Sequence, residues 1–173
     1  MPANSLNDLF RHGLGDIYDA EQQILSVLDQ METETADDTI RNRVRKHRDE
    51  TEQQIQNLER CFELLSAQAP RVQCAAIRGL RDEKRSFQQE NPSEQALEAF
   101  NLDAANKTEH YEIASYRGLI DQARVLGQDD VRRLLEQNLR QEEEMSRWIE
   151  EHQTEVLTRM QSMEGRTGAR ARR

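Results

Sequence analysis

The stretch LNDLFRHGLGDIYDAEQQILSVLDQM at residues 6–31 places an apolar residue at intervals of three, four or seven positions. This spacing is typical of one face of an α-helix, and it predicts a helix over about residues 5–33. The apolar series has one interruption, because Glu21 stands between Ile17 and Ile24 where the helix face should be buried. We therefore expect a long amphipathic helix whose inner face is apolar towards both ends and acidic at its centre.

Three later stretches repeat this periodicity and predict three more long helices. The second is expected to begin at Asp37 or Asp38, either of which can cap it, and to end before Pro70. The third is expected over about residues 92–126 and the fourth over about 129–160. The sequence therefore predicts an all-α protein.

The lengths of the connections favour one arrangement of these helices. The first and last links are a few residues long, which makes each linked pair antiparallel neighbours. Residues 68–91 form one long connection with room for a short helix at 74–85. Two hairpins joined by one long crossover are typical of the ferritin-like arrangement. We therefore predict a ferritin-like antiparallel four-helix bundle over residues 1–163. A long coiled coil is the alternative, but the sequence lacks its sustained apolar seam.

Composition and cysteine content narrow the class of protein. The chain is 35% hydrophobic and 33% charged, and seven glycines and three prolines are too few breakers for a β-sandwich or barrel. No stretch approaches the roughly 20 apolar residues of a membrane span, and the first ten residues do not resemble a secretory signal. Cys61 and Cys74 form no CxxC pair. These features predict a cytoplasmic protein with free thiols and no membrane contact.

The charge of the chain is unevenly distributed. The net charge is −9, which disfavours nucleic-acid binding by the body of the protein. Residues 164–173 carry four arginines and one glutamate, so this segment has a charge of +3 and the remainder −12. We expect the segment to be a disordered, solubilising basic tail, with contact to nucleic acid or a membrane surface as the alternative.

Each predicted helix carries a charged residue at the middle of its apolar stripe. A single buried glutamate costs several kcal/mol unless it is paired or coordinated, so a cluster of them requires compensating cations. The alternative is that these acids face solvent. The candidate residues are Glu21, His47, Glu50, Glu109, Glu112 and Glu142.

The distances of these residues from the two short turns support convergence. Glu21 and Glu50 lie about 15 and 14 residues from the first turn, and Glu112 and Glu142 lie equally far from the last turn, so antiparallel pairing brings each pair to one level. Carboxylates with one imidazole are suitable ligands for two iron or two manganese ions. We predict Glu50 and Glu112 as bridging ligands, His47 as the nitrogen ligand and the other candidates as terminal ligands.

Six segments of the chain have a familiar sequence: LNDLF at 6–10, DIYDAEQQ at 16–23, HRDETEQQ at 47–54, CAAIRGL at 74–80, EHYEIASY at 109–116 and NLRQEE at 138–143. With these segments the chain resembles the YciE/YciF-like family of ferritin-like stress proteins over about residues 5–155. The resemblance implies a ferritin-like bundle, a di-metal site formed by the six candidate residues, and a homodimer. Family members tend to have a second acid where this chain has Gln141, and an aspartate where it has Ser146.

The leading functional hypothesis is a non-haem di-iron or di-manganese protein that reacts with oxygen or peroxide during stress. A manganese-catalase-like peroxidase is a second enzymatic hypothesis. A metal-free helical protein that serves as a structural or adaptor dimer is the non-enzymatic alternative.

Overall fold

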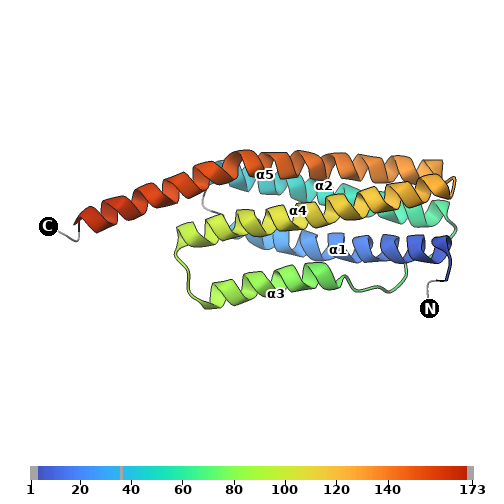
Figure 1. Ribbon diagram of the computed structural model, residues 1–173, viewed down its shortest axis with the longest axis horizontal. Coiled ribbons are helices and arrows are strands. Elements are labelled where there is room, and N and C mark those ends of the chain that lie inside the picture. The colour runs from blue at the N-terminus through green and yellow to red at the C-terminus, as the bar shows by residue number, and fades with distance from the viewer. Residues whose placement is uncertain (1–3, 36, 171–173) are drawn as a thin grey trace.

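The computed structural model describes residues 4–35 and 37–170, and for residues 164–170 the backbone alone (Figure 1). The described residues form helices and no strands, which confirms the all-α prediction. None of the helices in these ranges is both long enough and apolar enough to cross a membrane. The five helices are α1 (Leu6–Glu34), α2 (Asp38–Leu64), α3 (Ala75–Gln89), α4 (Glu94–Val125) and α5 (Asp129–Arg170).

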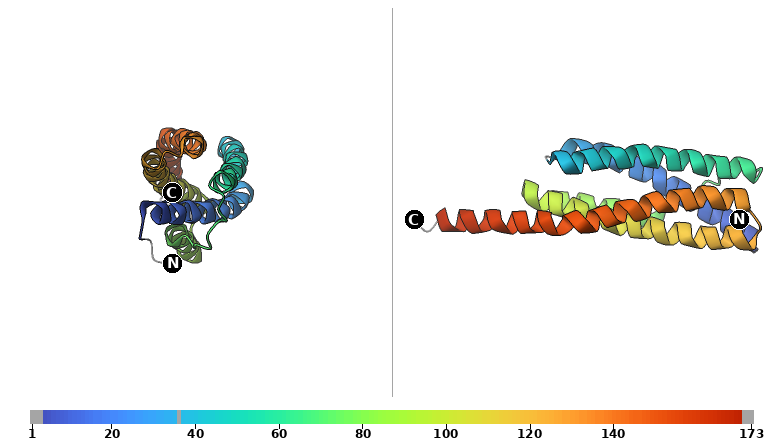
Figure 2. Two further views of the ribbon diagram at one scale, coloured as in Figure 1. Left: turned by 90° about the vertical axis from the view of Figure 1, so that its right-hand side faces the viewer. Right: turned by 90° about the horizontal axis from the view of Figure 1, so that it is seen from above.

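The four long helices form a closed bundle. Helix α1 packs on α2, α2 on α5, α5 on α4, and α4 on α1. Helix α3 packs outside this ring against α1 and α4, as the end-on view in Figure 2 shows. The links at residues 35–37 and 126–128 are short, and each joins two antiparallel helices (Figure 1). The predicted two hairpins and long crossover with a short helix are therefore present.

Side-chain caps explain where three of the helices begin. Ser5 accepts a hydrogen bond from the backbone N–H of Asp8, Asp37 accepts from Thr39 and Ile40, and Ser93 accepts from Ala96. Such caps satisfy backbone N–H groups that have no partner within the helix. The observed starts lie within two residues of the predicted ones.

The end of α5 differs from the prediction. The sequence predicts that this helix ends near residue 160 and that a disordered tail begins at residue 164, whereas the backbone is helical through Arg170. In Figure 1, α5 extends beyond the ends of the other helices. This segment contains no proline, and Gly165 and Gly168 each cost a helix only about 1 kcal/mol, so no residue in it forces the helix to stop. Residues 171–173 lie outside the described part of the chain.

The core is apolar towards both ends of the bundle and polar at mid-height. Ile17 and Ile24 are buried on either side of Glu21 on α1, and Leu135 is buried seven residues before Glu142 on α5. Both glutamates have an exposed fraction of 0%. The interruptions seen in the sequence are thus genuine polar positions inside the core.

The crossover packs tightly against α1 at Gly15. A Cβ atom at this position would lie 2.4 Å from Cγ of Pro70. We expect Gly15→Ala to lower the free energy of unfolding by about 1–3 kcal/mol, because the crossover must shift to relieve the overlap. Gly118→Ala on α4 is the matched control: nothing lies within 4 Å of its Cβ position, so alanine should raise stability by up to about 1 kcal/mol. Urea denaturation of both variants checks the prediction, and equal effects would contradict it.

Candidate metal centre

Five of the six candidate residues are buried together at mid-height in the bundle. Helices α1, α2 and α5 contribute one residue each, and α4 contributes two. The exposed fractions are between 0% and 2% for Glu21, His47, Glu109, Glu112 and Glu142.

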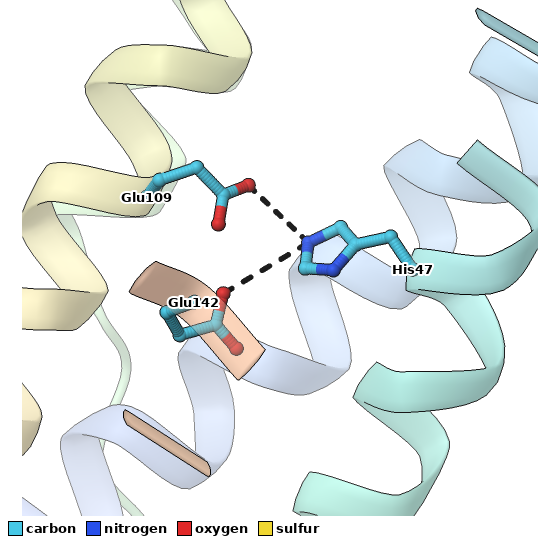
Figure 3. A group of neighbouring side chains, drawn as sticks. All are labelled: His47, Glu109 and Glu142. Carbon is cyan, nitrogen blue, oxygen red and sulfur yellow. Dashed lines mark ion pairs between the residues drawn. The ribbon is translucent and has the colours of Figure 1, made fainter. Parts of the chain in front are cut away.

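These five residues form two groups of three that share Glu142. One group is His47, Glu109 and Glu142, and the other is Glu21, Glu112 and Glu142; in each, one ligand atom from every residue lies within 4.8 Å of the others. Nε2 of His47 lies 3.2 Å from Oε1 of Glu109 and 4.0 Å from Oε2 of Glu142 (Figure 3). A carboxylate common to two such groups is placed as a bridging ligand would be.

Many of the polar atoms in the two groups have no hydrogen-bond partner within the described chain. Buried polar atoms are rarely left this way, because each unsatisfied one costs about 1–3 kcal/mol. Carboxylate oxygens and an imidazole nitrogen are suitable ligands for iron and manganese, so the residues present fit these cations. The atoms without a partner are Oε2 of Glu21, Glu109, Glu112 and Glu142, and Nδ1 and Nε2 of His47.

A network of hydrogen bonds orients two of the carboxylates. The hydroxyl of Tyr116 donates to Oε1 of Glu21, and the amide of Gln54 donates to Oε1 of Glu142. Asn138 donates in turn to the Tyr116 hydroxyl, at 3.0 Å, and to the backbone oxygen of Gln54, at 3.3 Å. Each of the two carboxylates therefore has one oxygen fixed by the protein and the other free.

Glu50 is placed differently from the other candidates. Its carboxylate lies 3.0 Å from Arg43, 3.2 Å from Lys46 and 3.7 Å from Nδ1 of His47, and the side chain is 13% exposed. Desolvation opposes its ionisation, but its interactions with His47 and Arg43 outweigh this and lower the pKa of Glu50 to about 2. Glu50 is thus held at the edge of the centre by cations and belongs to neither group.

One protein family matches most of the chain. A family model described as a domain of unknown function, DUF892, matches residues 5–162. The chain belongs to the DUF892 family. Protein YciF of Escherichia coli (strain K12) is 32% identical to it over 143 residues, which are 82% of this chain and 86% of YciF. The resemblance to YciF-like proteins is therefore confirmed.

Solved structures of similar proteins share the fold of this DUF892 chain. The crystal structure of the E. coli stress protein YciF matches with a TM-score of 0.84 and 28% identity, and covers 90% of this chain and 98% of YciF. YcfI of Rhodopseudomonas palustris, described as a putative structural protein, matches with a TM-score of 0.82 and 36% identity, over 86% of this chain and 94% of YcfI. The two descriptions assign different roles to proteins of one fold.

Helix α5 of this DUF892 chain lacks one acid that the resemblance leads us to look for. Ser146, where the resemblance implies an aspartate, is 6% exposed and lies one turn beyond Glu142. Gln141 is half-buried beside Glu142. Helix α5 therefore contributes one acid, Glu142, to the two groups.

Burial alters the protonation of the centre in the metal-free DUF892 protein. Desolvation raises the pKa of Glu21 to about 7, although the Tyr116 hydrogen bond and the charge of His47 partly offset it. Desolvation, followed by the charges of neighbouring acids, raises the pKa values of Glu112 and Glu142 well above their ordinary value. Burial alone would lower the pKa of His47, but the negatively charged carboxylate of Glu109 beside Nε2 raises that pKa to about 9. The metal-free centre therefore retains protons that a bound cation would displace.

These pKa values predict how the stability of the metal-free protein depends on pH. The protonated Glu21 contributes to the free energy of unfolding in full below its ordinary pKa of 4.5, and this contribution is lost as the pH rises through about 7. The contribution of protonated His47 is lost between its ordinary pKa of 6.5 and about pH 9. The lowered pKa of Glu50 changes the free energy of unfolding only below pH 4.5, so it does not oppose this trend. We expect the free energy of unfolding to fall steadily from about pH 5 to about pH 9. Urea denaturation of metal-free protein at several pH values checks this, and a rise over that range would contradict it.

Proposed function

We propose that this DUF892 protein is a ferritin-like stress-response protein that binds two iron or two manganese ions in its core and reacts with oxygen or peroxide. One observation carries the proposal: four buried carboxylates and one imidazole lie together inside the bundle, each with an atom that has no hydrogen-bond partner in the described part of the chain. The description of the related E. coli YciF as a stress protein supports the physiological setting.

The two groups suggest how the residues would share the ions. His47 Nε2 and Glu109 would hold one ion, Glu21 and Glu112 the other, and Glu142 would contact both. The bridging roles predicted for Glu50 and Glu112 thus pass to Glu142 in this proposal, and Glu112 becomes a ligand of one ion. Tyr116 and Gln54 keep Glu21 and Glu142 in fixed orientations, so the site needs little rearrangement on binding. Bound iron or manganese would supply the redox electrons that none of these side chains can supply.

We propose that Glu50 positions His47. Its carboxylate faces Nδ1 of His47, while Nε2 of the same ring faces Glu109 and Glu142. A carboxylate behind a ligating histidine fixes the ring orientation and increases its basicity as a ligand. Glu50 would therefore act on the metal through the imidazole.

Replacement of Glu50 tests this positioning role. We expect Glu50→Ala to weaken metal binding about 10- to 100-fold while two ions per chain still bind at saturation. Glu52→Ala is the matched control, because Glu52 is on the same helix with a side chain that is 46% exposed. Titration in competition with a chromogenic chelator measures both quantities. Loss of one whole equivalent in Glu50→Ala would show that Glu50 is itself a ligand.

Metal titration followed by oxidation tests the proposed function. Protein freed of metal with a chelator is titrated with Fe²⁺ or Mn²⁺ without oxygen, and two equivalents per chain are expected. The loaded protein is then exposed to oxygen or to peroxide, and metal oxidation is followed by absorbance. Evolution of oxygen from peroxide by the manganese form would favour the catalase-like alternative. No stoichiometric binding of either metal would remove the proposal.

The cellular location and oligomeric state also remain proposals. The resemblance to YciF-like proteins implies a homodimer, and the sequence predicts a cytoplasmic protein without membrane contact. A metal-free structural or adaptor dimer is the competing function, and the description of YcfI as a putative structural protein favours it. Sedimentation with and without metal tests the dimer, and a stability that does not respond to metal would support the competitor.

A further inference from the structure

An apolar pocket lies beside the candidate metal centre, on the side of the bundle that α3 covers. It lies between α1, α3 and α4 and has a volume of about 60 Å³. Val27 and Leu28 of α1, Leu80 of α3 and Ala105 of α4 form its sides, and His47 and Glu109 form its inner end. The inner end is therefore made by one of the two groups of candidate ligands.

The crossover helix closes the outer side of this pocket. Helix α3 packs outside the four-helix ring, and its buried residues are Ile77 and Lys84. Ile77 and Leu80 line the pocket from α3, which packs against α1 and α4. A bundle of the four long helices alone would leave this approach to His47 open to water.

The charged groups at the outer end of the pocket already have partners. Arg81 donates to Gln23 at 3.2 Å, and Lys84 lies 3.1 Å from a carboxylate oxygen of Glu34. These two side chains are thus engaged with α1 and leave the interior of the pocket apolar.

The sides of the pocket offer a polar molecule few hydrogen bonds. The hydroxyl of Thr108 donates to the backbone oxygen of Ala104 on its own helix, at 3.0 Å. Oδ1 of Asn101, and Oε2 of Glu109 at the inner end, are buried acceptors without a partner in the described chain. Hydrogen peroxide must give up hydrogen bonds with water to pass the apolar sides of the pocket, at a cost of about 1–3 kcal/mol for each O–H left unsatisfied there, whereas dioxygen has no such bonds to lose.

We propose that this pocket is a binding site for dioxygen and its route to His47 and Glu109. A volume of about 60 Å³ corresponds to roughly two water molecules, which suits a diatomic gas, and the apolar sides of the pocket offer water few hydrogen bonds. This inference rests on the proposed function. If the centre holds iron or manganese, the pocket makes dioxygen, in preference to peroxide, the oxidant that reaches it. The pocket residues Val27, Leu80 and Ala105 then determine which molecules enter.

Ala105→Leu tests the route because the larger side chain fills the pocket from α4. Ala114→Leu is the matched control, since Ala114 is exposed on the same helix. Leu80→Phe is a second filling variant, made from α3, in case the first does not fold. Equal Fe²⁺ stoichiometry in all variants shows that the centre is intact.

Two readouts separate the pocket from the centre. Crystals of metal-free protein under xenon pressure should show xenon in the pocket for the unaltered chain and for Ala114→Leu, and none for Ala105→Leu. In loaded protein, oxidation of Fe²⁺ by dioxygen should be at least about tenfold slower in Ala105→Leu and Leu80→Phe, while oxidation by peroxide stays unchanged.

Each contrary result has a distinct meaning. No xenon in the pocket of the unaltered chain would overturn the binding site. Xenon excluded by Ala105→Leu together with an unchanged rate with dioxygen would overturn the route. Failure to bind Fe²⁺ would overturn the proposed function and with it the identity of the oxidant, while the xenon result would still decide whether the pocket binds an apolar gas.

Discussion

Replacing Glu142 by glutamine is expected to abolish binding of both metal ions and, at the same time, to make the metal-free protein more stable. Glu142 belongs to both groups of candidate ligands, so the substitution removes a negative charge that each ion requires. Metal analysis after dialysis measures the first effect, and urea denaturation of metal-free protein measures the second.

The stabilisation follows from the environment of Glu142. Its Oε1 accepts a hydrogen bond from Gln54, and its Oε2 has no partner in the described chain. The carbonyl of the new amide keeps the bond from Gln54, and its NH₂ group can donate to the neighbouring Glu109 or Glu112. An acid that tolerates burial only when protonated is thereby replaced by a neutral group of similar volume. We expect a gain of about 1–3 kcal/mol.

Glu143→Gln is the control for this variant. Glu143 is adjacent in sequence, but its side chain is 31% exposed and is paired with Arg117 at 2.8 Å. Metal binding should be retained, and stability should change by less than about 1 kcal/mol, as for other surface ion pairs. Retention of two tightly bound ions in Glu142→Gln, or loss of stability in its metal-free form, would contradict our account of the centre.

The second large effect is expected from metal loading of the unaltered protein. A cation that binds only the folded chain adds about 4 kcal/mol of stability when its free concentration is 1,000 times Kd. For a domain of this size that corresponds to an increase in Tm of about 8–16 °C. The ion also displaces protons from the centre, so the increase should grow with pH, in the direction opposite to the pH trend of the metal-free protein.

Thermal unfolding with Mn²⁺, or with Fe²⁺ in the absence of oxygen, measures this effect. Addition of a chelator should restore the lower Tm, and Glu142→Gln should show no increase at the same metal concentration. A Tm that stays the same on loading at every pH would favour the metal-free structural alternative.

Much of this architecture could be predicted because helix periodicity and short turns are local properties of the sequence. Two links of a few residues force their helices to be antiparallel, and similar distances from the turns then place Glu21 level with Glu50 and Glu112 level with Glu142. His47 could be predicted because it lies on the same stripe of its helix. The five buried candidates could therefore be identified from the spacing of residues in the sequence alone.

The role of Glu50 could not be predicted in this way. A spacing of three residues turns a helix face by about 60° from alignment, which is compatible with either a core or an edge position. Glu109 and Glu112 have the same spacing as His47 and Glu50, yet both are buried. What places Glu50 at the edge is its contact with Arg43 and Lys46, and this depends on how α2 is rotated within the bundle.

The polar residues that support the centre were also missed. Gln54, Asn57 and Asn138 are buried, but in a single helix such residues look like solvent-facing positions. Their role is evident only when contacts between helices are known: Asn57 of α2, for example, donates a hydrogen bond to Asn138 of α5 at 2.7 Å. A usable signal was their position: Gln54 lies seven residues after His47, and Asn138 lies four before Glu142, each on the same helix face as a ligand.

Anomalous scattering tests the central claim most directly. Crystals of the unaltered protein grown with Mn²⁺, and separately with Fe²⁺ without oxygen, would be measured on both sides of the absorption edge of each metal. We predict two anomalous peaks per chain, one between Glu142 and the His47–Glu109 pair and one between Glu142 and the Glu21–Glu112 pair. Peaks confined to surface acids, or an absence of peaks between these five side chains, would contradict the account.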